Sequence, residues 1–501
     1  MTSTGLLLAL SLSVAAPTAP TAPPLLAAPT TPLLLATVLR QADLLHPSTV
    51  AASADVDVAS ADLLSAEGIF DPTLRTRGDV EGGNYLAGTA DAAIDVLTPL
   101  WGTRVEGGWR MGVGDFPTYD GKKKTNDFGE FRLGVAVPLL RDGAIDSRRA
   151  TLTKLRIELQ ARQEALRQAR LDVARVAASA YWDWVGAGAR LAIDENLLEL
   201  ALTRESQLRR RADAGDLPAF EVQDNSRLIA SRQGRVITAR RALERTALTL
   251  ALYLRDDDGV PRAPTRPQLP SLPSLPSLPS LPSLPSLPSS ALATAAPTRE
   301  ALVTQALQQR PEARRGRLLL QQLAVDDDAA TNQLLPGLSL TAAISQDVGG
   351  TSAPLSSSSS VWNPDPKTRG LPDGRVGLAF DLPIAQRAAR GRAAQVDAAQ
   401  ARARSLLQLV NDRIALEVDD ATQAWQAAQE RSVTTATEVD AALVVAAGER
   451  QRFEAGDSTL LLVNLREVAA AEARVAAADA AIDRARADVA LALVTARLLE
   501  D

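Results

Sequence analysis

The sequence predicts an α+β protein made of two similar halves, in which short strands precede a very long helical hairpin. Matching segments recur 241 residues apart, and the clearest pair is Arg211–Asp216 and Arg452–Asp457. In each half, a segment with glycine and aromatic residues is followed by a long stretch without proline. Because matching segments occur at corresponding places in both halves, we expect one structural unit used twice, an internal structural repeat.

Composition excludes several classes of protein. The 54 basic and 60 acidic residues give a net charge of -6 and are mixed along the chain, so no clustered basic face indicates nucleic-acid binding. Cysteine is absent, which excludes disulfides and thiol catalysis. The single histidine, His46, precedes a proline and is interpreted as a helix-end residue. No metalloprotease, P-loop or serine-hydrolase motif occurs, so we expect neither enzymatic activity nor a cofactor.

The chain divides into five segments. A short apolar run followed by small residues predicts a signal peptide over residues 1–16, and the Pro/Ala-rich residues 17–32 are expected to be disordered. The two repeats are predicted over 33–258 and 298–501. Between them, residues 259–297 contain repeated Ser-Leu-Pro triplets, which favour polyproline II and indicate a linker.

Each repeat is expected to open with a helix and continue with strands. Strands are predicted at about 70–140 and about 337–384, where short runs alternate loosely and end at Pro138 and Pro383. Weak alternation with aromatic residues and polar loops fits a membrane barrel. It fits an ordinary soluble sheet equally well, so the strand pattern by itself leaves both architectures open.

The helical hairpins are predicted over residues 144–254 and 387–499. In the first, apolar residues recur every seven positions as in a coiled coil: Leu152, Leu159, Leu166, Val173 and Ala180. A helix of about 65 residues is about 100 Å long, too long for the core of a compact domain. Each helix must therefore pack along other helices of similar length.

Four motifs in this order resemble the TolC family of outer-membrane efflux and export proteins, also called outer membrane factors. The most specific is Arg452–Val463, which resembles the family's hairpin signature of an aromatic residue, glycine, small polar residues and an apolar helix start. Further matches are Phe70–Pro72, Pro138–Gly143 and Gln333–Pro336. The resemblance covers residues from about 33 to 500.

The resemblance implies a homotrimer in the outer membrane. Each protomer would give about four strands to a shared β-barrel, which continues as a long antiparallel α-helical barrel in the periplasm. Closure by copies is also physically required, because open sheet edges are not tolerated in lipid. The implied function is a passive exit duct of a tripartite efflux or type I secretion system, with a periplasmic adaptor and an inner-membrane pump as partners.

The resemblance places the periplasmic gate and adaptor contacts at the two hairpin tips, Ala214–Asp224 and Ala455–Leu465. The candidate residues are Gly215, Asp216, Glu221, Asp224, Gly456, Asp457 and Ser458. An acidic residue follows the tip glycine by six positions in the first half, Glu221, but Leu462 stands there in the second. The acids fit equally well as solvated residues that cap helix starts.

A second function class stays open: a soluble periplasmic coiled-coil scaffold or interaction protein with a small peripheral sheet. Two acidic runs, Asp256–Asp258 and Asp326–Asp328, could attract a divalent cation. Charge runs near helix ends more often form solvated surface, so no metal site is predicted.

Overall fold

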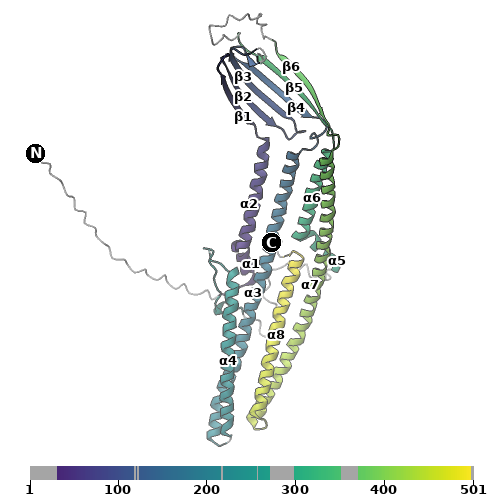
Figure 1. Ribbon diagram of the computed structural model, residues 1–501. Coiled ribbons are helices and arrows are strands. Elements are labelled where there is room, and N and C mark those ends of the chain that lie inside the picture. The colour runs from purple at the N-terminus through teal and green to yellow at the C-terminus, as the bar shows by residue number, and fades with distance from the viewer. Residues whose placement is uncertain are drawn as a thin grey trace, which may run out of the picture.

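The computed structural model describes residues 31–117, 120, 123–215, 218–256, 258–270, 298–350 and 371–497. These residues form an elongated molecule with a sheet at one end and long helices below it (Figure 1). The predicted signal peptide and the Ser-Leu-Pro triplets lie outside the described residues, as does the candidate Asp216.

The α-helices follow the same order in both halves, but among the described residues the first half has four strands and three short 3-10 helices, whereas the second has two strands. In the first half the elements are α1 Leu35–Leu45, α2 Pro47–Glu67, η1 Gly68–Phe70, β1 Thr73–Glu81, β2 Ala87–Leu97, β3 Arg104–Gly114, β4 Glu130–Pro138, α3 Ser147–Asp213 and α4 Ala219–Leu250, followed by η3 Ala251–Tyr253 and η4 Arg266–Gln268. In the second half they are α5 Arg299–Gln309, α6 Pro311–Asn332, β5 Gly337–Asp347, β6 Asp373–Asp381, α7 Arg387–Ala455 and α8 Leu460–Val494.

The opening helix of each half is broken once by a proline. His46 and Arg310, the residues before Pro47 and Pro311, have extended backbones with ψ of 131° and 132°. Proline disfavours the helical conformation of the residue before it, so the helix must stop and restart there. The His46 side chain then caps α2 by accepting a hydrogen bond from the Ser48 N–H at 3.3 Å.

The sheet has six strands in the order β1-β2-β3-β4-β5-β6, all neighbours being antiparallel. The expectation of about four strands per protomer is therefore wrong. That number came from the family resemblance, whereas the region 70–140 alone holds four strands. Small and charged residues in β1 and β2 hide their alternation, because few bulky apolar side chains mark the exposed face.

Below the sheet the helices form one layer. Next to the sheet, α2 packs on α3, α3 on α6 and α6 on α7. Further down, α4 packs on α3, α3 on α8 and α8 on α7. At each level four helices thus lie side by side (Figure 1). The chain leaves α2 into edge strand β1 and passes from edge strand β6 into α7, so the edges of the sheet and of the helical layer coincide.

The largest apolar core lies midway along the helices. Trp184 and Leu191 of α3 are buried there against Val38 of α1 and Leu250 of α4. The Tyr181 hydroxyl donates to the Leu33 carbonyl at 3.0 Å, and burial raises the pKa of this tyrosine to about 12. The described start of the predicted linker belongs to this core as well, since Leu269 packs against it.

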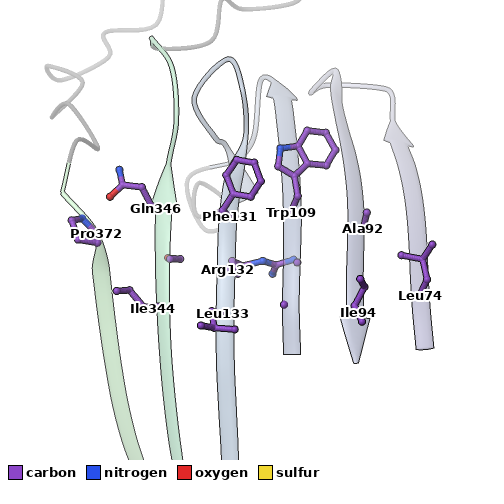
Figure 2. A pocket seen from close by; sticks show the side chains of 13 residues that line it. Leu74, Ala92, Ile94, Trp109, Phe131, Arg132, Leu133, Ile344, Gln346 and Pro372 are labelled. Atoms are coloured by element: carbon purple, nitrogen blue, oxygen red, sulfur yellow. The ribbon is translucent and has the colours of Figure 1, made fainter. Parts of the chain in front are cut away.

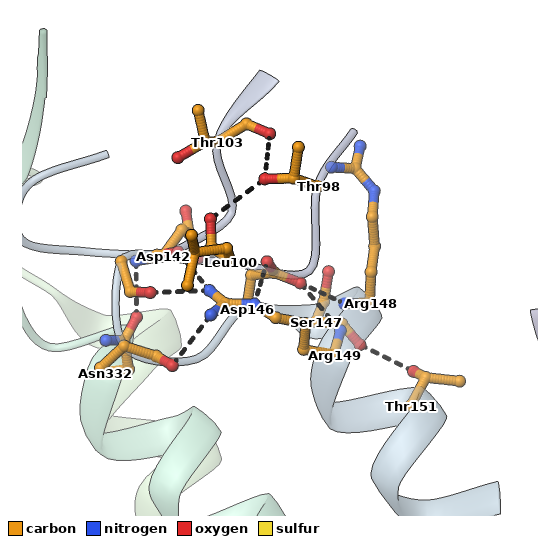
Figure 3. A network of polar contacts seen from close by, with 12 residues as sticks. Thr98, Leu100, Thr103, Asp142, Asp146, Ser147, Arg148, Arg149, Thr151 and Asn332 are labelled. Atoms are coloured by element: carbon orange, nitrogen blue, oxygen red, sulfur yellow. Dashed lines mark hydrogen bonds and ion pairs between the residues drawn. The ribbon is translucent and has the colours of Figure 1, made fainter. Parts of the chain in front are cut away.

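A polar network joins the sheet to the helices (Figure 3). Asp146 caps α3 by accepting from the Arg148 and Arg149 N–H groups at 2.8 and 2.9 Å. The Arg149 guanidinium also binds the Asp142 carbonyl at 2.7 Å, and the Asp142 N–H donates to Asn332 Oδ1 of α6 at 2.7 Å. Burial alone would raise the pKa of Asp146, but its bonds to Arg149 outweigh burial and lower it. The Pro138–Gly143 motif therefore connects both halves.

Candidate functional site

The strand registers give the sheet two chemically different faces. Paired residues share a face, so the register assigns every second residue of each strand to the same side. One face is apolar across all six strands: Leu74, Val80, Ile94, Val96, Val105, Trp109, Met111, Phe131, Leu133, Val135, Leu338, Leu340, Ile344, Val376, Leu378 and Phe380. The other face carries the charged residues.

The apolar face is exposed to solvent. Val80 is 84% exposed, Val376 76% and Leu378 70%. Figure 2 shows Trp109 and Phe131 beside each other near the loop end of the sheet, with Leu133 and other aliphatic residues below. They line a shallow hollow of about 510 Å³ that crosses the sheet. A contiguous apolar surface of this kind indicates contact with a membrane or another protein.

The opposite face is lined by ion pairs between strands. Arg75 of β1 contacts Asp95 of β2 at 2.9 Å, and Arg110 of β3 contacts Glu130 of β4 at 2.6 Å. Arg132 of β4 reaches past β3 to Asp91 of β2 at 2.7 Å. A surface of paired charges binds water well, so this face suits an aqueous compartment.

The connection between β3 and β4 folds onto the charged face. The register places Gly112 on that face, and a Cβ atom built on this glycine would lie 1.9 Å from the Lys123 carbonyl oxygen. The Gly112 N–H donates to the buried Thr125 hydroxyl at 3.0 Å. The Asn126 N–H donates to Asp347 Oδ1 of β5 at 3.3 Å. Residues 123–126 therefore cover part of the charged face near its loop end.

At the first hairpin tip, the predicted residues Gly215, Glu221 and Asp224 have different environments. Gly215 follows the end of α3 in the left-handed conformation, with φ of +82°. Glu221 lies in the first turn of α4, and one of its carboxylate oxygens is buried without a hydrogen-bond partner. Asp224 forms an exposed ion pair with Arg227 one turn away, at 3.1 Å. Neither acid caps α4, because its N-cap is Pro218 without a side-chain hydrogen bond.

At the second tip, Gly456 ends α7 with φ of +89°, a conformation that glycine adopts without steric cost. The Asp457 N–H donates to the Arg452 carbonyl at 2.9 Å. Neither Asp457 nor Ser458 caps α8. Thr459 is the N-cap, and the Ser458 hydroxyl instead donates to Glu449 of α7.

The two tips meet around a shared groove of about 800 Å³. Glu221 and Asp224 line it from the first tip, and Thr459, Leu460 and Leu461 from the second. Apolar side chains around the tips are exposed in unusual number: Phe220, Leu461, Leu462 and Leu465. The tips therefore present apolar surface beside acidic groups, a combination suited to a protein partner.

A buried carboxylate near the tips joins all four long helices. Glu467 of α8 is 2% exposed and contacts Arg204 of α3, Arg232 of α4 at 3.4 Å and Arg450 of α7 at 3.3 Å. Arg204 also donates to Asn464 Oδ1 at 2.7 Å. Burial lowers the pKa of Arg232, although the nearby Glu467 charge opposes that shift.

Sequence reasoning missed this cluster and the two faces of the sheet. Its residues are spread over four helices, and Glu467 has Ser226 as its counterpart 241 residues earlier, so the repeat gives no signal. The faces follow from strand registers, which the weak alternation of β1 and β2 does not reveal. The apolar residues exposed at the second tip could be predicted from the sequence, because Leu460–Val463 is a continuous apolar run.

The acidic runs and the helices of the described residues complete the description of possible sites. No group of three His, Asp or Glu side chains in this part of the chain is placed to hold a metal ion. Asp326, from one of the acidic runs, instead pairs with Lys154 at 2.9 Å. Among the helices that the structure describes, none is both long and apolar enough to cross a membrane.

Comparison with solved structures identifies the fold. The chain is similar to the outer-membrane channel OprN, with a TM-score of 0.59 and 18% identity over 92% of this chain and 89% of that one. It is also similar to CusC, described as forming a transmembrane channel, with a TM-score of 0.59 and 16% identity over 92% of this chain and 91% of that one. For the outer membrane protein VceC of Vibrio cholerae, the TM-score is 0.57 and the identity 18% over 92% of this chain and 95% of that one.

No protein-family model matches the chain, and no curated protein sequence matches it significantly. The likeness therefore rests on three-dimensional structure over nearly the full length of both partners. The chain has the fold of the TolC-type outer-membrane channels that its motifs resemble.

Proposed function

We propose that this protein is the outer-membrane exit duct of a tripartite export system. Three copies form the duct, with the sheets in the outer membrane and the helices in the periplasm. Substrates pass through it passively, and a pump in the inner membrane supplies the energy through a periplasmic adaptor. Drug efflux and type I protein secretion both fit this role, because the pump selects the substrate.

The single observation that carries the proposal is the exposed apolar face of the sheet. It continues over all six strands, which have 9 or 11 residues each. A strand that crosses a bilayer needs about 9–11 residues. Phe131 lies one residue from the loop end of β4 and Phe380 one residue from the opposite end of β6, as expected of aromatic residues near the two membrane interfaces, and Trp109 lies opposite Phe131 on β3.

The ion-paired face supports an aqueous lumen. In a membrane barrel the interior is polar and the exterior apolar, so lipid contact on one face places Arg75, Arg110 and Arg132 with their partners inside. A soluble scaffold would instead have to cover the apolar face with protein. In the described residues no α-helix packs extensively on the sheet, and only the short helix η1 contacts β2, which favours the duct over the scaffold.

The tips supply a contact for the adaptor. Their exposed apolar residues lie farthest from the sheet, and Glu221 and Asp224 line the groove between them. Because Leu462 and Leu465 replace these acids in the second half, we propose that a constriction at the tips carries threefold rather than sixfold negative charge. The fixed Glu467 cluster, just above, holds the hairpins of one chain together.

Paired arginine substitutions on opposite faces of one strand test the proposal. Leu133→Arg places a charge on the apolar face, and Ala136→Arg places it on the charged face of the same strand β4. A charge at the bilayer midplane costs about 2–4 kcal/mol, so Leu133→Arg should lose most of its folding into lipid vesicles. The Ala136 variant should fold as wild type. Equal folding of both variants, or detergent-free solubility of the wild type, contradicts the duct and favours the scaffold.

A further inference from the structure

We infer that the membrane barrel is built from six-stranded sheets joined edge to edge, β1 of one copy against β6 of the next, so that three copies close eighteen strands. The inference rests on the proposed function, since it assumes a barrel in lipid. It differs from the twelve strands implied by the family resemblance. The pore is incomplete without the neighbouring copies, which supply its walls.

Among the described strands, both outer strands of the sheet have an unpaired edge, and these edges have equal length. β1 and β6 have nine residues each, and every residue of β1 and all but one of β6 are exposed. In a meander of six strands the first and last run in opposite directions, so β1 can pair antiparallel with β6 of another copy. An unpaired edge in hydrocarbon leaves backbone N–H and C=O groups unsatisfied, which forces such pairing.

Side chains on the two edges are complementary when the strand ends are aligned. Thr73 then pairs with Asp381 of the next copy, which keeps apolar residues of both strands on the lipid side. Gly78 lies opposite Val376, a small residue against a large one. On the charged face, Asp79 lies opposite Arg375, so an ion pair continues the pattern found within the chain.

The stagger of the strands supports this alignment independently. Within one chain, the row of paired residues that begins at Thr73 ends at Arg375. In the next copy the row continues at Asp79, six residues further along β1. With about 3.3 Å per residue and about 4.8 Å between strands, this stagger tilts the strands by about 35°. Membrane barrels have tilts of about 35–45°, so the closed barrel has ordinary geometry.

The width of the helical layer agrees with six strands rather than four. At this tilt six strands span about 35 Å around the barrel and four span about 23 Å. The four helices beneath, α2, α3, α6 and α7, span about 32–40 Å at the usual spacing of about 8–10 Å. Sheet and helices therefore have matching circumferences only if β1 and β2 belong to the barrel.

Cysteine pairs test the inference in a chain that has no cysteine of its own. Val376→Cys on β6 is combined in turn with Thr76→Cys, Gly78→Cys or Val80→Cys on β1, and with Met111→Cys on β3. Each purified variant is oxidised and its linked species are counted on denaturing gels. We expect Gly78→Cys to give disulfide-linked trimers at least tenfold faster than its neighbours, because a shift of two residues moves the Cα atoms beyond disulfide range.

Three results would overturn the inference. Links formed fastest with Met111→Cys would mean that β1 and β2 lie outside a twelve-stranded barrel. Disulfides within single chains would mean that one sheet closes on itself. An absence of links from all pairs, in double-cysteine variants that conduct as wild type, would exclude edge pairing while the proposed duct stands. A wild-type protein that forms no channel would instead contradict the proposed function.

Discussion

Replacing Glu467 by glutamine removes the negative charge that the buried guanidinium groups of Arg204 and Arg232 contact. The substitution keeps the size of the side chain and one acceptor oxygen. Its effect therefore reports the lost charge rather than a cavity. Because Glu467 contacts one arginine on each of α3, α4 and α7, the change should loosen all four long helices near their tips.

The magnitude follows from burial. The side chain of Glu467 is 1% exposed, and those of Arg204 and Arg232 are 7% and 4% exposed, so water cannot replace the lost charge. Removing one partner of such a buried pair costs about 3–5 kcal/mol. The contact with Arg450, which is 40% exposed, adds little, since exposed pairs contribute about 0–1 kcal/mol.

Amide hydrogen exchange of the trimer measures this effect where it occurs. At about 1.4 kcal/mol per factor of ten, we expect exchange at the lower ends of the four helices to rise by about two to more than three orders of magnitude. The matched control is Glu244→Gln on α4, whose partner Arg241 lies one turn away and is exposed. It should change exchange by less than about fivefold.

A second variant separates charge from packing. Glu467→Leu combined with Arg204→Met and Arg232→Met removes the whole buried cluster, and such apolar replacements are often neutral or stabilising. We expect protection at the tips to return to the wild-type level or above. If Glu467→Gln alone leaves exchange within fivefold of wild type, the reasoning from burial is refuted.

Three further predictions concern single positions. Asp146→Ala removes the cap of α3 and its ion pair and should cost about 0.5–2 kcal/mol or more in thermal unfolding, whereas Ser147→Ala should have little effect. Burial, and secondly the charge of Arg255, lowers the pKa of His46 from its usual 6.5. The contribution of His46 to stability is therefore complete above pH 6.5 and is lost as the pH falls through the lower folded pKa. In His46→Asn, the melting temperature should depend less on pH between about pH 7 and 5 than it does in the wild type. Gly112→Ala should displace the β3–β4 connection and speed labelling of a Thr125→Cys reporter at least tenfold, and an unchanged rate would show that the connection does not rest on the sheet.

Much of the helical architecture could be predicted from the sequence. The absence of proline and the seven-residue repeat predicted a helix of about 65 residues at the start of the hairpin over 144–254, with a matching one in the hairpin over 387–499, and α3 and α7 occupy Ser147–Asp213 and Arg387–Ala455. Local rules suffice for such segments, because helix hydrogen bonds join residues four apart. The breaks at Pro47 and Pro311 were visible in the same way, although a single helix was expected across each.

The sheet and the candidate site depended on distant pairings. Counting strands required the partners of β1 and β2, whose alanines, glycines and aspartates carry a weak pattern. At the tips, the two glycines were recognisable because their backbone conformation favours glycine. Glu467 was not, since its three arginine partners lie up to 263 residues away and only the folded chain brings them together.

Single-channel recording shows whether this chain forms a conducting duct. The purified wild-type trimer is added to one side of a planar lipid bilayer and the current is recorded at fixed voltage. We predict discrete, long-lived conductance steps that are absent with the Leu133→Arg variant. A correctly folded trimer that inserts into the bilayer and never conducts would contradict the claim that this chain forms an outer-membrane duct.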